Sequence, residues 1–240
     1  MRFTSEQRLD DGALEREFTL GGIPGILWTP GSAPAPLILS GHNGGLHKRE
    51  PRLVARARHF AARYGFAVAA IDHPGHGDRP RSAADERARA DLRRAMRAGE
   101  PVDEIFESFV APLVEKAVPE WRTALDALLS LPGIGGPVGY SGMTAVGIRL
   151  AVAEPRVSAA GFFAGGFVPR AQREEARQVT VPLQFLLQWD DEGNPRQRAL
   201  DLFDAFGAEE KTLHANPGGH AGTPWFEVDD GARFFARPLK

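Results

Sequence analysis

The 240-residue sequence contains no cysteine, which excludes both a disulfide framework and a cysteine nucleophile. It also lacks any apolar run of 18 residues, so we expect no membrane-spanning helix. Neither sign of charge dominates: the formal net charge is -2 at pH 7, which favours neither nucleic acid nor a membrane surface as a partner. No apolar stretch of signal-peptide length opens the chain, and the sequence therefore predicts a cytoplasmic protein.

Hydrophobic residues make up 42% of the chain, enough for one well-buried core, and we expect a single domain over residues 1–240. Short apolar runs alternate with segments of helical period from residue 36 onward, a pattern typical of βαβ units and a mostly parallel sheet. Strands are predicted at 17–20, 23–28, 36–40, 66–71, 137–140, 157–163, 181–188 and 211–214. Helices are predicted at 53–64, 121–131, 144–153, 196–206 and 226–236.

Residues 79–118 differ from the rest of the chain. They are rich in arginine, aspartate, glutamate and alanine, have helical period, and contain a break at Gly99-Glu100-Pro101. We expect two or three helices that form a small lid over the sheet.

A serine stands between a predicted strand and a predicted helix, in the run Gly139-Tyr140-Ser141-Gly142-Met143. Small neighbours permit the sharp strand-to-helix turn that raises a serine hydroxyl into a cleft, and such a turn directs the N–H of Gly142 at a developing oxyanion. We therefore predict that Ser141 is a nucleophile on such a turn. The alternative is a serine that caps the helix beginning near residue 142.

A carboxylate and a histidine follow the next strands. Asp191 comes after the strand at 181–188, and His220 lies in a glycine-rich loop after the strand at 211–214. Because the carboxyl ends of parallel strands share one edge of the sheet, we expect both near Ser141, with His220 as the base and Asp191 as its orienting acid. Asp190 and His214 remain as alternatives for the acid and the base.

The glycine-rich loop Ser40–Gly45 follows another predicted strand. We predict that the backbone N–H of Asn43 or Gly44 joins that of Gly142 in an oxyanion hole, against the alternative of an ordinary glycine turn. The adjacent basic run, 47–49, is expected to be solvated.

The segment DHPGHGD (72–78) holds two histidines and two carboxylates, which suggests a metal. No further ligands stand at suitable spacings, and Pro-Gly favours a turn. We predict no metal and no cofactor.

Four pieces of this sequence together resemble one known superfamily. They are LSGHNGG (39–45), IDHPGHGD (71–78), GYSGM (139–143), and DDEGNP (190–195) with NPGGHAG (216–222). They resemble the α/β-hydrolases, nearest in layout to the dienelactone-hydrolase-like and bacterial serine esterase branches, over about residues 16–236. The resemblance implies a mostly parallel, eight-stranded α/β-hydrolase sheet flanked by helices.

The resemblance also bears on the site. In these families a turn of the pattern Asp-x-x-Gly-x-Gly follows a strand, and here Asp72 begins that turn. The acid in these families stands four residues before a proline, which favours Asp191 over Asp190. The base follows a glycine pair, as His220 does. Dienelactone hydrolases proper use cysteine, which this chain lacks, and Met143 replaces the usual last glycine of the nucleophile motif.

We expect a serine hydrolase that cleaves a carboxylic ester, or a related thioester or lactone, through an acyl-enzyme intermediate. Its substrate is a small molecule, and it needs no cofactor, nucleic acid or membrane. Two alternatives are a non-catalytic ligand-binding or sensor protein on the same scaffold, and a metal-dependent hydrolase that uses His73 and His76.

Overall fold

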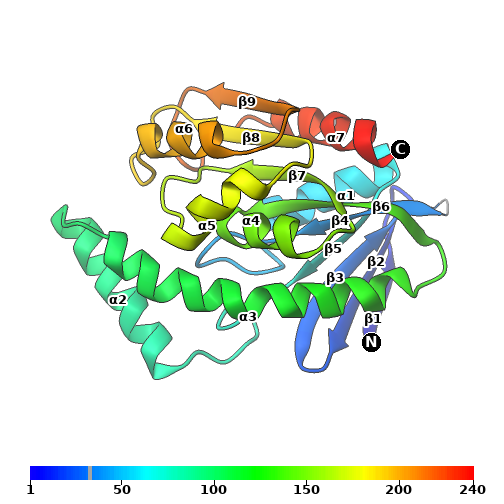
Figure 1. Cartoon of the computed structure of the whole chain (residues 1–240). Coiled ribbons are helices and arrows are strands. Elements are labelled where there is room, and N and C mark those ends of the chain that lie inside the picture. The colour runs from blue at the N-terminus through cyan, green and yellow to red at the C-terminus, as the bar shows by residue number, and fades with distance from the viewer. Residues whose placement is uncertain (32–33) are drawn as a thin grey trace.

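The computed structural model describes residues 1–31 and 34–240, and its centre is one nine-stranded sheet in the order β1-β2-β3-β5-β4-β6-β7-β8-β9 (Figure 1). From β4 onward neighbouring strands are parallel, whereas β1, β2, β3 and β5 pair antiparallel. The strands are β1 (Arg2–Arg8), β2 (Leu14–Leu20), β3 (Ile23–Thr29), β4 (Ala35–Ser40), β5 (Ala67–Ile71), β6 (Ile134–Met143), β7 (Val157–Phe163), β8 (Leu183–Gln188) and β9 (Lys211–Asn216).

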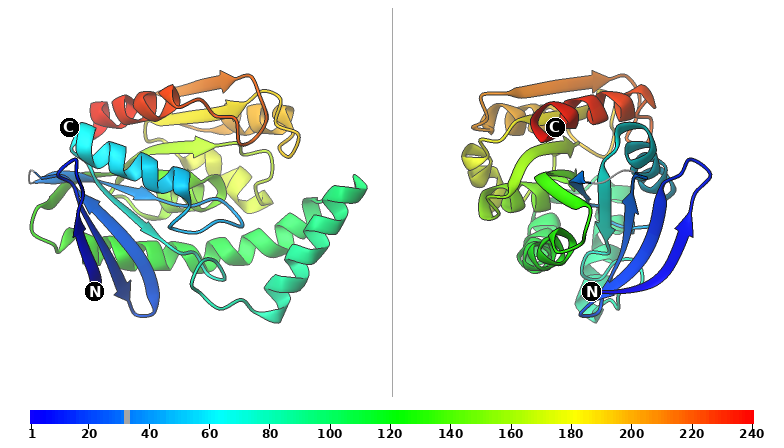
Figure 2. Two further views of the ribbon diagram at one scale, coloured as in Figure 1. Left: turned by 180° about the vertical axis from the view of Figure 1, so that it is seen from behind. Right: turned by 90° about the vertical axis from the view of Figure 1, so that its right-hand side faces the viewer.

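Helices cover both faces of the sheet (Figure 2). The helices are α1 (Pro51–Tyr64), α2 (Ala83–Ala98), α3 (Asp103–Leu129), α4 (Thr144–Ala153), α5 (Arg170–Glu175), followed by the 3₁₀ turn η1 (Ala176–Gln178), α6 (Arg196–Ala205) and α7 (Phe226–Leu239). Buried side chains of α1 and α7 form one hydrophobic cluster with the sheet, and those of α3, α4 and α6 form a second, larger cluster on the opposite face.

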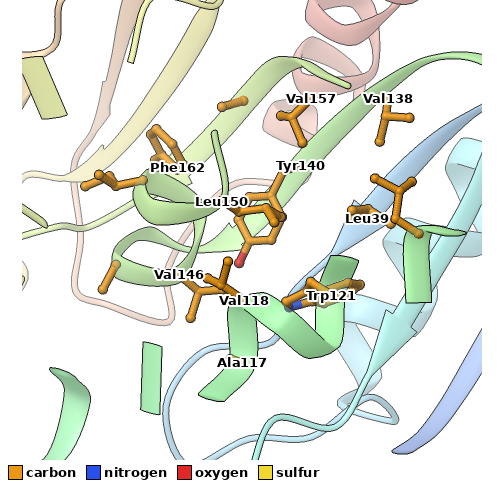
Figure 3. Packing of buried hydrophobic residues seen from close by; sticks show 14 of the residues in the cluster. Leu39, Ala117, Val118, Trp121, Val138, Tyr140, Val146, Leu150, Val157 and Phe162 are labelled. Atoms are coloured by element: carbon orange, nitrogen blue, oxygen red, sulfur yellow. The ribbon is translucent and has the colours of Figure 1, made fainter. Parts of the chain in front are cut away.

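The larger cluster attaches α3 to the centre of the sheet. Trp121 of α3 and Tyr140 of β6 are fully buried, and their rings stand edge to face with centroids 6.1 Å apart (Figure 3). Aromatic side chains of this size contribute a large apolar area each, and the edge-to-face arrangement adds about 0.5–1.5 kcal/mol. This contact fixes α3 against β6, close to the end of the strand where Ser141 lies.

Two glycines make the turn between β2 and β3. Gly21 and Gly22 have φ of 55° and 85°, the left-handed conformations that a two-residue hairpin turn requires and that glycine adopts without strain. The strands predicted at 17–20 and 23–28 are thus joined as an antiparallel hairpin.

Most elements agree with the sequence pattern, and the helix at 144–153 and the strand at 157–163 do so to the residue. The sheet has nine described strands instead of the predicted eight because β1 was missed. Six of its seven residues are exposed, so it lacks the alternation of buried and exposed side chains that identifies a strand. It is ordered by backbone pairing with β2 at the sheet edge.

The predicted break between the lid and a helix starting at Trp121 is wrong, since α3 runs without interruption from Asp103 to Leu129. It contains Pro112 and Pro119, each of which removes one backbone donor and costs a helix about 3 kcal/mol. Nine buried side chains on the helix outweigh that cost through packing. α2 and the start of α3 project from the body of the molecule (Figure 1). Within the described residues, no helix combines the length and the apolar character needed to cross a membrane.

The turn after β5 is organised around the fully buried carboxylate of Asp72. This carboxylate accepts hydrogen bonds from the backbone N–H of Lys48 at 2.8 Å, from Lys48 Nζ at 2.7 Å and from the N–H of Asp78 at 3.1 Å. Lys48 is 3% exposed, so the expectation of a solvated basic run at 47–49 is wrong for this residue. A buried ion pair therefore joins the loop after β4 to the loop after β5.

We predict that Gly77→Ala destabilises the protein far more than Gly12→Ala. Both glycines have positive φ, 55° and 87°, so each substitution forces an L-residue into a left-handed conformation at about 1–2 kcal/mol. A Cβ at Gly12 meets nothing within 4 Å, whereas one at Gly77 overlaps the Asp72 carboxylate. Disturbing that buried ion pair raises the expected loss to about 3–5 kcal/mol. Urea unfolding of both variants measures the difference, and equal losses would contradict this account.

Candidate active site

Ser141 lies near the end of β6, between Ser40 of β4 and Gly161 of β7 in the sheet register. Its hydroxyl lies beside Gly161, because a Cβ at that position would come within 3.4 Å of Ser141 Oγ. The missing side chain at residue 161 leaves space around the hydroxyl.

The predicted sharp turn at Ser141 is wrong, and so is the alternative that Ser141 caps a helix. β6 continues to Met143, which is the N-cap residue, and α4 begins at Thr144. Ala164 is the only non-glycine residue with positive φ in the described part of the chain, so Ser141 does not have a left-handed backbone conformation. Gly142 touches Gly41 (a Cβ there would lie 2.6 Å from Gly41 Cα), and Met143 packs against the larger cluster. These contacts keep both residues in the sheet. A glycine in place of Met143, at the fifth position of the motif Gly-x-Ser-x-Gly, would permit an earlier turn.

His220 and Asp191 form a close pair. Nδ1 of His220 lies 2.6 Å from Oδ2 of Asp191. The Asp191 side chain is 1% exposed and that of His220 is 55% exposed, so the acid is shielded while the imidazole faces solvent. Asp190 has a different partner, because its Oδ2 accepts the N–H of Gly218 at 2.9 Å. Of the two adjacent aspartates, Asp191 is the one that contacts His220.

The imidazole of His220 stands over the end of β7. Its ring centroid lies 5.0 Å from that of Phe163, which follows Gly161 by two residues. Residues two apart on a strand share a face and are about 6.6 Å apart. The Phe163 ring that His220 contacts is therefore on the same face of β7 as Gly161, which pairs with Ser141 on the neighbouring strand. Within residues 1–31 and 34–240, no hydrogen bond joins the Ser141 hydroxyl to the imidazole.

His214, the alternative base, is engaged elsewhere. Its Nδ1 lies 2.8 Å from Oε2 of Glu227 on α7, and Gln184 of β8 lies beside its ring. His214 therefore belongs to the interface between the sheet and the C-terminal helix.

The loop after β4 is held against β6. The N–H of Gly41 donates to the carbonyl of Ser141 at 2.9 Å. The carbonyl of Asn43 lies 2.9 Å from Nδ1 of buried His42 and accepts the N–H of Leu46 at 3.1 Å. In a trans peptide the N–H is directed opposite to the carbonyl, so the N–H of Gly44 is directed away from His42.

Three buried histidines, His42, His73 and His76, support this loop. Nε2 of His42 accepts the N–H of His73 at 3.1 Å, and Nε2 of His73 accepts the indole N–H of Trp121 at 3.1 Å. Burial lowers the pKa of His76 to about 4 and also lowers the pKa values of His42 and His73, so all three are neutral at pH 7.

Three of the four ring nitrogens of His73 and His76 have polar contacts, and Nδ1 of His73 is buried without a hydrogen-bond partner in the described part of the chain. Nε2 of His73 is taken by Trp121, and the two ring nitrogens of His76 contact the carbonyl of Pro74 and the guanidinium of Arg89 at 2.9 and 2.8 Å. These contacts favour a structural role for the pair over the metal-dependent alternative.

The start of α3 meets the loop after β7. The rings of Phe106 and Phe167 stack with centroids 4.7 Å apart, and a pocket of about 60 Å³ lies beside them, bordered by Asp103 and Arg170. Further along α3, Leu113 and Val114 are buried in the larger cluster, and Phe109 packs against it.

Comparison with known proteins agrees with this layout. No protein-family model matches the sequence, and no curated protein matches it. Solved structures do match. A cold-adapted esterase from an Arctic intertidal metagenomic library, bound to PEG, is 29% identical with a TM-score of 0.79 over 100% of both chains. The chain has an α/β-hydrolase fold of the dienelactone-hydrolase-like type.

Two more distant α/β-hydrolases share this fold. An acetyl xylan esterase from Paenibacillus sp. R4 is 14% identical with a TM-score of 0.69, over 99% of this chain and 88% of that one. A dienelactone hydrolase from Anabaena variabilis is 17% identical with a TM-score of 0.64, over 98% of this chain and 99% of that one. The α/β-hydrolase sheet expected from the sequence is confirmed, with one more strand.

We predict that the protein loses stability as the pH falls from 6.5 toward 4, partly through His76. Its folded-state pKa of about 4 lies below the unfolded value near 6.5, so the unfolded chain binds the proton first. This stability is complete above pH 6.5 and falls by about 2 kcal/mol between pH 7.5 and 5 for this one group. Urea unfolding at both pH values measures it. His76→Asn should reduce the dependence, and the exposed-residue control His47→Asn should not; identical pH dependence in all three proteins would contradict the assignment.

Proposed function

We propose that this protein is a serine hydrolase that cleaves a carboxylic ester, with Ser141 as nucleophile, His220 as base and Asp191 as orienting acid. The observation that carries the proposal is the contact between His220 and the shielded Asp191, on the same sheet edge as Ser141. A buried carboxylate that binds one imidazole nitrogen leaves the other free for proton transfer. The esterases among the structural neighbours support the same reaction class.

In the proposed mechanism Nδ1–H of His220 donates to Asp191, and Nε2 accepts the proton of Ser141 as the hydroxyl attacks the carbonyl. The imidazolium formed is stabilised by Asp191 and protonates the leaving alcohol. Water then releases the acyl group by the same route. The contact between His220 and Ser141 forms in the reacting complex, since catalytic hydrogen bonds are often complete only when substrate is bound.

The oxyanion is proposed to bind backbone N–H groups at the junction of two loops. The N–H of Gly44 is directed away from His42, and Asn43 precedes it in the same loop. Gly142 contacts Gly41 at the base of this loop and supplies the third N–H. Because Gly142 belongs to β6, the direction of its N–H is fixed by the strand and not by the N-terminus of α4.

The substrate is proposed to be a small ester, thioester or lactone, which the same acyl-transfer chemistry accepts. The chain acts as a single domain in the cytoplasm, with α2 and the start of α3 as the lid within residues 79–118. A ligand-binding or sensor protein on this scaffold is the alternative, and it predicts no turnover.

We predict that Ser141→Ala abolishes hydrolysis of short p-nitrophenyl esters and labelling by a fluorophosphonate probe. Loss of the nucleophile removes the acyl-enzyme route, for which a fall in kcat of about 10⁶ is typical. The control Ser158→Ala changes a half-buried serine on β7, whose hydroxyl donates to the carbonyl of Arg156, and should leave both signals intact. Wild-type protein that neither hydrolyses any ester of the series nor reacts with the probe would favour the sensor alternative.

We predict that Asp191→Asn lowers kcat by about 10³–10⁴, because an amide cannot stabilise the imidazolium or hold its tautomer. The neighbouring change Asp190→Asn should lower kcat less than about tenfold, since the carboxylate of Asp190 accepts a hydrogen bond from the backbone of Gly218 and not from His220. Steady-state kinetics with one ester compares the two. A larger loss in Asp190→Asn would assign the acid to the other aspartate.

A further inference from the structure

Three potential metal ligands converge between β9 and α7, away from the proposed triad. His214, Glu227 and Asp230 each present one ligand atom, and these atoms lie within 4.8 Å of one another. Glu227 and Asp230 are three residues apart on α7 and so share one face of the helix. His214 approaches from the edge strand, with Nδ1 2.8 Å from Oε2 of Glu227.

The carboxylate of Glu227 is buried without a permanent cation. Its side chain is 5% exposed, and its contacts are the amide of Asn216 at 2.7 Å and the imidazole of His214. Among the described residues no lysine or arginine nitrogen lies within 4.0 Å of it. Burying an ionised carboxylate is costly unless a counter-charge accompanies it, so this position favours a bound cation.

The surroundings match those of a metal ligand. Asn216 donates to Oε1 of Glu227 and leaves Oε2 for the shared site, as groups that orient ligating carboxylates do. The side chains of His214 and Asp230 are 30% and 35% exposed, which gives an ion a path from solvent. Arg233 donates to Oδ1 of Asp230, at 2.7 Å.

We propose that His214, Glu227 and Asp230 bind one divalent cation of the zinc class, which joins the C-terminal helix to the edge strand. One imidazole and two carboxylates are ligands that Zn²⁺ accepts, with water in the fourth position. Tetrahedral bonds of about 2.1 Å place ligand atoms about 3.4 Å apart, a spacing between the present 2.8 Å pair and the 4.8 Å limit. On binding, the ring proton of His214 moves from Nδ1 to Nε2 and the metal takes its place on Nδ1. The amide of Gln184, whose nitrogen lies 3.3 Å from Nε2, must then present its oxygen to that N–H.

Isothermal titration of the full chain with ZnCl₂ at pH 7.5 tests this proposal. We expect one Zn²⁺ per wild-type chain, and at least tenfold weaker binding in His214→Ala and in Asp230→Asn. Asp230→Asn alters a partly exposed side chain and keeps the test valid if His214→Ala does not fold. Zinc should also raise the thermal unfolding midpoint of the wild type but not of these variants.

The matched control is His59→Ala. His59 Nε2 lies 2.8 Å from Oδ1 of Asp229, the same separation as in the proposed site but without a third ligand, and this variant should bind zinc like the wild type. Absence of stoichiometric binding in wild type, or equal binding in His214→Ala, would overturn the proposal. So would loss of binding in His220→Ala, which would place the metal at the triad. None of these readouts depends on ester hydrolysis, so the proposed function and the metal site are tested separately.

Discussion

The carboxylate of Asp72 has no access to solvent, and the loops on this edge of the sheet are arranged around the need to neutralise it. Burial by itself would raise the pKa of Asp72, but hydrogen bonds from Lys48 and Asp78 outweigh burial and hold the pKa below its usual value. The ionised form is therefore kept, at the cost of fixing Lys48 in place. Because Lys48 follows the loop that contacts Ser141, one buried charge pair positions that loop relative to β6.

The sheet and its helices were largely predictable because their patterns are local. The runs at 157–163 and 144–153 have the length and periodicity of a buried strand and a buried helix, and nothing in the tertiary structure overrides them. Two elements were not predictable in this way. β1 forms through pairing at the sheet edge, and α3 continues through Pro119 because Trp121 and its neighbours are buried.

The proposed site was predictable in its residue types and less so in its geometry. The sequence selected Asp191 over Asp190 through a resemblance, and the observed contact with His220 is the arrangement that choice requires. The backbone at Ser141 was not predictable, because the course of β6 depends on contacts of Gly142 with Gly41, about a hundred positions earlier. The contacts of His73 with His42 and Trp121 join three separate segments, and no local pattern indicates them.

Helix α3 has a mechanical consequence for entry to the small pocket near Phe106. Its 27 residues form a rod about 40 Å long, and the indole of Trp121, which is hydrogen-bonded to His73, anchors its far half in the core. Outward movement of the near half must therefore either pull that indole from its partner or bend the rod. Pro112 leaves the carbonyl of Ser108 without its helical donor. A bend at this position therefore breaks one backbone hydrogen bond fewer than a bend in an uninterrupted turn of the helix. The residue at position 112 thus determines how easily α3 bends to admit a large ligand to the pocket near Phe106.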